Sequence, residues 1–203
     1  RNGIETLGPQ VARVAVNVAD VDLSLFTGRA RLDGLVVGNP SGSRSPHALS
    51  LNSARVSVRL SSVLSRRVVV EGIHVEGLEV TYEGGPGSNN LTRILANIEA
   101  NNRGAPRQQP GPDRRFYVRE LALRGGRITV ASGSGPALTI PLPDIHLKEL
   151  GRENGLTAGE LAQHVLAAIT QGTALAVAGA VGSGMASGGA KAVGGIRDVL
   201  RRQ

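Results

Sequence analysis

Aliphatic and polar residues alternate with a period of two over most of the stretch from residue 11 to residue 82. This pattern predicts strands with one buried and one wetted face, and we therefore expect an antiparallel sheet that is covered on one side. The alternation slips by one position at Ala19 and Asp20, which predicts a bulge or bend within one long strand. Gly72 and Gly77 punctuate the last part of the stretch into two short predicted strands. The aliphatic residues expected to form a core or to face lipid are Val14, Val16, Val18, Leu23, Leu25, Val56, Val58 and Leu60.

The period changes to that of a helix over residues 89–99. Leu91, Ile94, Leu95 and Ile98 form one apolar stripe, which predicts a short amphipathic helix lying on the sheet. The residues just before the stripe, Ser88, Asn89 and Asn90, are all good helix caps. Residues 101–113 are rich in Pro, Gly and Gln, and we expect a flexible loop there.

Strand patterning resumes at residue 114 and continues to about residue 150. Gly125–Gly126 and the segment "SGSGP" each predict a turn that joins two antiparallel strands in a hairpin. The segments "GIHVEGLEVTYEGG" and "ELALRGGRITVASG" echo each other as glycine-punctuated strand pairs, but the echo is too weak to define a repeat. We expect the sheet to occupy residues 1–150 and a helical segment to occupy residues 151–203.

The C-terminal helical segment opens with a capping box, Thr157-x-x-Glu160, directly ahead of an apolar stripe in which Gly172 is placed to stop or kink the helix. No side chain between Leu161 and Ala190 is formally charged. That run exceeds the ~20 residues that cross a bilayer, but its glycines and serines make it only weakly hydrophobic.

Small residues recur every four positions in this segment, a pattern that lets another helix approach closely. We expect the helix to pack on another copy or to dock on a membrane. The final "IRDVLRRQ" carries Arg197, Arg201 and Arg202, which suit a helix C-terminus or anionic lipid headgroups. The small residues are Ala168, Gly172, Ala176, Ala180, Gly184, Gly188 and Ala192.

The charge, the aromatic content and the lack of cysteine limit the classes of function that the chain could have. The 203 residues carry a net charge of +7, chiefly from arginines that are spread along the chain, which fits either a solvated polar face or an anionic partner. Nucleic acid is not the predicted partner, because two tyrosines and two phenylalanines offer little surface for base stacking. There is no cysteine, so disulfides are excluded.

Catalysis and cofactor binding have no support in the sequence. The four histidines, His47, His74, His146 and His164, include no pair at helical ligand spacing. No nucleophile elbow, Walker motif or dinucleotide fingerprint is present. We therefore predict no catalytic residue, no metal and no cofactor.

Several stretches, taken in order, resemble the N-terminal module of AsmA-like proteins of the Gram-negative envelope. They are "VADVDLSLFTGRARLDGLVVGNPSG", "LSLNSARVSVRLSSVLSRRVVVEGIHVEGLEVTYEGG" and "NNLTRILANIEAN". The resemblance extends over about residues 11–148, although "GLVVGNP" is also similar to a turn of small desiccation-related β-sandwiches. The matching positions are Asn39, Pro40, Gly42, Leu60, Ser61, Val63, Leu64, Gly77, Tyr82, Asn90, Leu91 and Asn97.

The resemblance implies an α+β protein with a curled antiparallel sheet. It also implies a location on the periplasmic side of the inner membrane, with an N-terminal anchor that precedes Arg1. In larger members of the family a curled sheet forms an apolar groove for acyl chains, whereas this chain is too short to bridge two membranes. The same aliphatic residues would equally form a closed core. The expected function is therefore non-enzymatic, in lipid binding or envelope homeostasis. The alternative is an accessory subunit that binds a membrane protein complex or self-assembles through its C-terminal helix.

Overall fold

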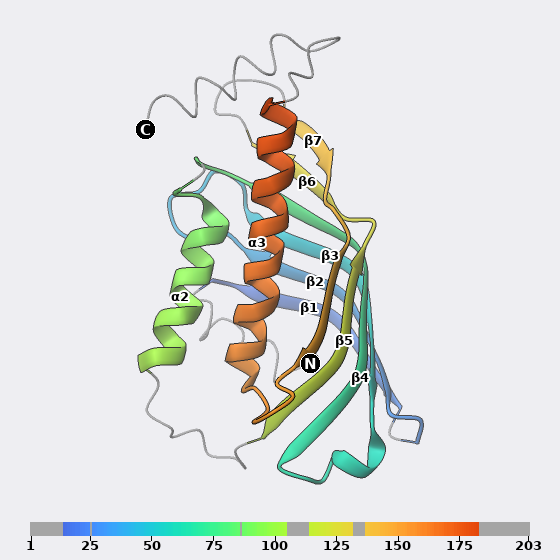
Figure 1. The fold of residues 1–203 in the computed structure, drawn as a ribbon. Helices are drawn as coiled ribbons and strands as arrows, with labels where there is room; N and C mark the ends of the chain where they lie inside the picture. Colours follow the sequence, from blue (N-terminus) through green and yellow to red (C-terminus); the bar gives the residue numbers. More distant parts are fainter. Residues whose placement is uncertain (1–13, 25, 86, 105–113, 132–136, 183–203) are drawn as a thin grey trace.

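The computed structural model describes residues 14–24, 26–85, 87–104, 114–131 and 137–182, which form a curled sheet with two helices on its concave face (Figure 1). The strands are β1 (Val16–Ser24), β2 (Arg29–Gly38), β3 (His47–Val58), β4 (Arg67–Tyr82), β5 (Arg115–Arg124), β6 (Arg127–Val130), β7 (Leu138–Pro141) and β8 (Ile145–Leu150). The helices are the short 3-10 turn η1 (Leu60–Ser62), α2 (Asn90–Gly104) and α3 (Ala158–Gly182).

The strands lie in the order β1-β2-β3-β4-β5-β8, and β6 and β7 continue β5 and β8 along the second half of the long strand β4. The predicted class, α+β with a curled sheet, a helix on it and a C-terminal helix, is confirmed. The sheet is mixed rather than wholly antiparallel, because β5 and β6 pair with β4 in parallel. The reason is the crossover: α2 returns the chain from the end of β4 to the end at which β4 began, as parallel pairing requires.

A row of irregular positions crosses the sheet from strand to strand. The strand pairing is interrupted at each position in the row and continues regularly on both sides of it. Gly34, Gly77 and Gly125 have φ angles of 64°, 68° and 62°, a left-handed conformation that favours glycine. The complete row, which we call the bend row, is Ala19, Gly34, Asn52, Gly77 and Gly125.

The bend row explains the slip in the hydrophobic alternation. On its two sides the inward-facing residues are three positions apart, as with Leu51 and Ala54 in β3 or Val75 and Leu78 in β4. The bend predicted at Ala19 and Asp20 is therefore confirmed, and it belongs to every strand that the row crosses. Left-handed glycines within strands are typical of such bends.

Two predictions about glycines in the sheet are wrong. Gly72 and Gly77 do not divide residues 67–82 into two strands, because β4 runs through both. Gly125–Gly126 is not a hairpin turn, because β5 and β6 pair with β4 in one constant register. The weak internal echo has the same origin, since Gly77 and Gly125 lie beside each other in the bend row. The second hairpin signal is confirmed, since β6 and β7 are antiparallel neighbours.

The two helices close the concave face. In α2 the predicted stripe is buried at Leu91, Ile94 and Ile98, and the helix continues to Gly104, beyond its predicted end at residue 99. In α3 the buried stripe is Leu166, Ile169, Thr173 and Val177. Both helices share one hydrophobic core with the sheet, in which Val80, Val118 and Ile128 are almost completely buried.

Candidate functional site

The apolar concave face is the first candidate site. Val14, Val16 and Val18 are buried, and Val56 and Val58 are partly buried against the core. Leu60 differs from the rest of this predicted set: it is 44% exposed and lies in η1, after the end of β3. Leu25 and the side chain of Leu23 lie outside the described residues.

The helix α3 is unusual for its length and its uncovered apolar surface. It has 25 residues and is long and apolar enough to cross a membrane, yet only 22% of its most apolar stretch is buried within the protein. The predicted capping box is confirmed: the Thr157 N–H donates to Glu160 Oε2 at 2.7 Å, and the Glu160 N–H donates to Thr157 Oγ1 at 3.2 Å. The exposed face of its second half is formed by Gln171, Ala174, Leu175, Ala178, Gly179 and Gly182.

The predicted ridge of small residues is described only in its first half, and that half lies against the chain's own sheet. A Cβ atom on Gly172 would meet Ile145 Cδ1 at 3.4 Å and Leu142 Cδ1 at 3.6 Å. Ala176 and Ala180 pack on the core. The predicted stop at Gly172 is wrong, because α3 continues through it to Gly182. The remaining predicted residues, Gly184, Gly188, Ala192, Arg197, Arg201 and Arg202, lie outside the described residues.

Two hydroxyl groups on α3, those of Thr170 and Thr173, are buried and have no hydrogen-bond partner among the residues that the structure describes. Thr173 has no exposed surface and sits in the buried stripe between Ile169 and Val177. A buried hydroxyl without a partner destabilises the folded state by about 1–3 kcal/mol. The packing of α3 on the sheet is therefore less favourable than its apolar composition alone would make it.

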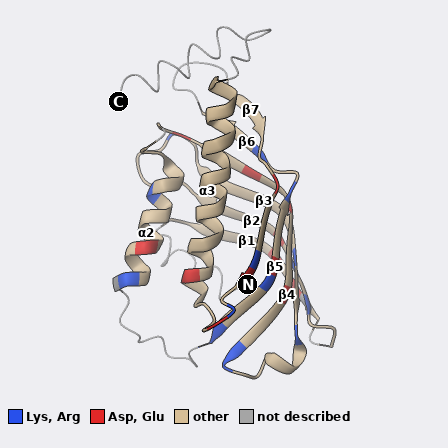
Figure 2. Cartoon of the chain, in the orientation of Figure 1, with Lys and Arg blue, Asp and Glu red and all other residues tan. Residues whose placement is uncertain are grey.

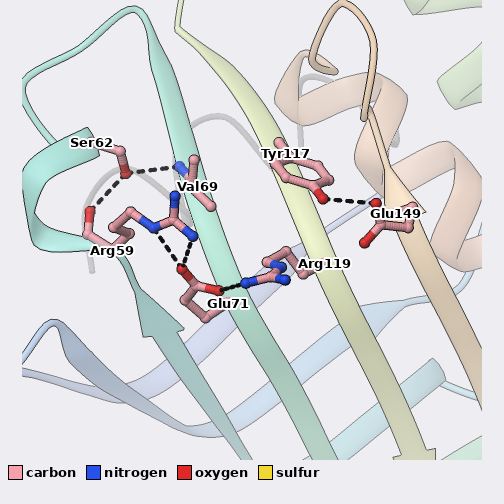
Figure 3. A network of polar contacts seen from close by, with 7 residues as sticks. All are labelled: Arg59, Ser62, Val69, Glu71, Tyr117, Arg119 and Glu149. Carbon is pink, nitrogen blue, oxygen red and sulfur yellow. Dashed lines mark hydrogen bonds and ion pairs between the residues drawn. The ribbon is translucent and has the colours of Figure 1, made fainter.

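A cluster of polar side chains occupies the opposite, convex face of the sheet at one end (Figure 3). Its centre is Glu71, an extra residue in β4, because Ser57 pairs with Gly72 while the next residue, Val58, pairs with Val70. A bulge of this kind redirects a side chain. Here it brings the Glu71 carboxylate between two guanidinium groups, at 2.6 Å from that of Arg59 and 3.0 Å from that of Arg119.

The charges of this cluster and its hydrogen bonds fix the connection between β3 and β4. Hydrogen bonds from Arg119 and Arg59 lower the pKa of Glu71 below its ordinary value. The Ser62 hydroxyl donates to the Arg59 carbonyl at 2.7 Å and accepts from the Val69 N–H at 2.9 Å, which ties η1 to β4.

A neighbouring pair extends the cluster to the edge strand β8. The Tyr117 hydroxyl donates to Glu149 Oε2 at 2.8 Å, and this bond raises the pKa of Tyr117. The Arg67 guanidinium lies 5.0 Å from the centre of the Tyr117 ring and donates to the carbonyls of Gly151 and Arg152. These contacts join separate strands and loops. In the part of the chain that the structure describes, no group of three His, Cys, Asp or Glu side chains could hold a metal ion.

At the other end of the sheet, the side chains of Asn39 and Asn90 meet. Asn90 Nδ2 donates to Asn39 Oδ1 and to the Thr81 carbonyl, both at 2.7 Å, and Asn90 Oδ1 accepts from the Glu83 N–H at 3.0 Å. The cap of α2 is the preceding residue, Asn89, whose Oδ1 accepts from the Thr92 N–H at 3.0 Å. The Asn-Pro turn and the start of α2 are therefore locked together.

The sequence did not single out the residues of the convex cluster. Glu71 and Arg119 are far apart along the chain and meet only through the parallel pairing of β4 with β5, which cannot be predicted from neighbouring residues.

A scan against protein-family models finds no matching family, and a search of curated proteins finds no matching sequence. The fold and its surfaces thus define an α+β protein with a helix-covered curled sheet and one largely uncovered apolar helix.

Proposed function

We propose that this protein is a non-enzymatic, membrane-associated envelope protein that binds lipid. The observation that carries the proposal is α3, a 25-residue apolar helix that the rest of the chain leaves mostly uncovered. Exposed apolar surface of this extent is typical of contact with a membrane or another protein. Leu175 and its neighbouring alanines are apolar, so their exposure to water is unfavourable in free energy. Acyl chains would cover them and remove that cost. The periplasmic side of the inner membrane is the location that the resemblance to AsmA-like proteins suggests.

A second candidate is an accessory subunit that packs through α3 on a membrane protein complex or on another copy. Its support is the spacing of Ala174, Ala178 and Gly182, small exposed residues that recur every four positions on the uncovered face. Such spacing lets a second helix approach closely. In this role the protein handles no lipid.

Native mass spectrometry of the full chain after gentle extraction separates the two candidates. Lipid binding predicts phospholipid adducts on the chain, and a Leu175→Glu substitution should reduce them, because it places a charge on the uncovered face of α3. The matched control is Ala162→Glu, an exposed site near the start of the same helix. Oligomers or complexes without phospholipid would favour the accessory subunit. A lipid-free monomer would contradict both.

A further inference from the structure

Two adjacent connections at one end of the sheet expose large apolar side chains. Phe26 follows β1 and is 96% exposed, whereas Leu64 lies between β3 and β4 and is 94% exposed. The two connections are neighbours, since the Val58 N–H donates to the Gly28 carbonyl at 2.7 Å. Leu60, 44% exposed, belongs to the second connection. Side chains this exposed contribute nothing to the core, and several of them gathered at one end of the sheet form a candidate contact surface.

Arginines crowd the same end, which we call the basic end: residues 24–29, 59–67, 114–115 and 151–157 (Figure 2). Glu153 lies within these ranges, and Glu71, Glu149 and Glu160 form ion pairs with Arg59, Arg152 and Arg115. Arg29, Arg66 and Arg114 are exposed, and within the described part of the chain none of them forms an ion pair. The arginines of the basic end are Arg29, Arg59, Arg66, Arg67, Arg114, Arg115 and Arg152.

We propose that the basic end docks on an anionic phospholipid bilayer, with Phe26 and Leu64 entering the interfacial layer and the arginines meeting the headgroups. This inference rests on the proposed membrane association and names the surface that makes the contact. A bilayer interface accepts both kinds of residue at once, because apolar tips enter the acyl boundary while guanidinium groups stay among the phosphates. A nucleic acid would neutralise the arginines but would give no apolar environment to the leucine.

The convex cluster makes the basic end a firm surface rather than a pair of loose loops. Arg59 and Ser62, which flank Leu60, are bonded to β4 through Glu71 and Val69. Arg67, at the other end of the same connection, is held by carbonyls of the 151–152 turn. Leu64 is therefore presented on a connection that is fixed at both ends, so little conformational freedom is lost when it docks.

Flotation of the full chain with lipid vesicles tests the proposal. The vesicles contain either phosphatidylcholine alone or equal parts of phosphatidylcholine and phosphatidylglycerol. Wild-type protein should bind the anionic vesicles about tenfold more strongly, and added salt should weaken the binding, because exposed charges are screened. The doubly substituted variants Phe26→Ser/Leu64→Ser and Arg29→Glu/Arg66→Glu should each lose about tenfold in binding.

Matched controls place the same changes elsewhere on the surface. The control Arg124→Glu/Arg127→Glu reverses two exposed arginines beside the bend row, and Leu175→Ser measures separately what α3 contributes to binding. We expect the arginine control to bind the anionic vesicles as wild type does, and Leu175→Ser to lose less binding than either basic-end variant. All these side chains are exposed, and thermal unfolding verifies that each variant remains folded.

The outcomes separate this proposal from the proposed function. If wild type binds vesicles and the basic-end variants bind equally well, docking through the basic end is wrong while membrane association stands. A loss confined to Leu175→Ser assigns the contact to α3 and also overturns the basic end. If wild type binds neither kind of vesicle, both proposals fail. Arginine-dependent binding to RNA without binding to vesicles would replace the bilayer by a nucleic acid.

Discussion

Replacing Asn90 by alanine should destabilise the protein more than any other single change of a polar side chain at that end of the sheet. Asn90 is 2% exposed and makes three hydrogen bonds, to Asn39, Thr81 and Glu83. Each bond contributes about 1 kcal/mol, and each partner left unpaired out of water costs up to a further 1–3 kcal/mol. Because these partners are only partly buried, we expect a total loss of about 3–5 kcal/mol.

Urea denaturation followed by circular dichroism measures this loss directly. A small domain is stable by only about 5–15 kcal/mol, so the midpoint should fall markedly. Asn90→Asp should be about as damaging, because a carboxylate cannot donate to Asn39 Oδ1 or to the Thr81 carbonyl. The control Asn52→Ala alters an exposed asparagine in the bend row and should change stability by less than about 0.5 kcal/mol.

A double-mutant cycle tests whether the Asn-Pro turn and the helix start act as one unit. Asn39→Ala and Asn90→Ala remove opposite ends of the same 2.7 Å bond, so their costs should overlap by about 0.5–3 kcal/mol. The reasoning is refuted if Asn90→Ala costs less than about 1 kcal/mol, or if Asn90→Asp is as stable as wild type.

Three further predictions concern other parts of the fold. Thr173→Val should raise stability by about 1–2 kcal/mol in denaturant titrations, because it removes a buried hydroxyl without a partner; a loss of stability would show that the hydroxyl is bonded. Gly125→Ala should cost about 1–2 kcal/mol for its left-handed backbone, whereas Gly34→Ala should cost more, because its Cβ would lie 2.7 Å from the Ala19 Cβ; equal costs would contradict the packing of the bend row. The pKa of Glu71 is lowered in the folded state, so its stabilisation should persist at neutral pH and disappear as the pH falls through that lowered pKa. The stability difference from Glu71→Gln should therefore shrink below about pH 4, and a difference constant down to pH 3 would exclude the effect.

Local patterns were sufficient for the elements that depend on near neighbours. The α2 stripe follows from helical spacing, the capping box of α3 from four consecutive residues, and the bend at Ala19 from a slip in alternation. Each of these features is encoded within a few residues, where side-chain periodicity and backbone hydrogen bonding act directly. The glycines were read wrongly for a related reason: Gly77 and Gly125 carry the same local signal whether a strand bends or ends, and only their partners across the sheet decide.

The convex cluster and the basic end could not be predicted from local sequence patterns. Glu71 meets Arg119 only because α2 makes the pairing of β4 with β5 parallel. The turn that carries Phe26 lies beside Leu60, through Gly28, only because β2 pairs with β3. The arginines therefore appeared evenly spread along the chain although the fold gathers many of them at one end. Pairing between distant strands, rather than residue type, creates both surfaces.

The packing of the two helices decides where acyl chains would enter if they reach the concave face. Asn90 bonds the start of α2 to the sheet and to the neighbouring turn, so moving α2 would break three partly buried hydrogen bonds. Beyond its first turn α3 meets the sheet through small and aliphatic residues, and it buries two hydroxyls without partners. Separating α3 from the sheet would expose apolar surface, which lipid would cover, and would free those hydroxyls to form bonds. A groove for acyl chains would therefore open beneath α3 rather than beneath α2, and a substitution that stabilises α3 on the sheet, such as Thr173→Val, should reduce the phospholipid that remains bound to the purified chain.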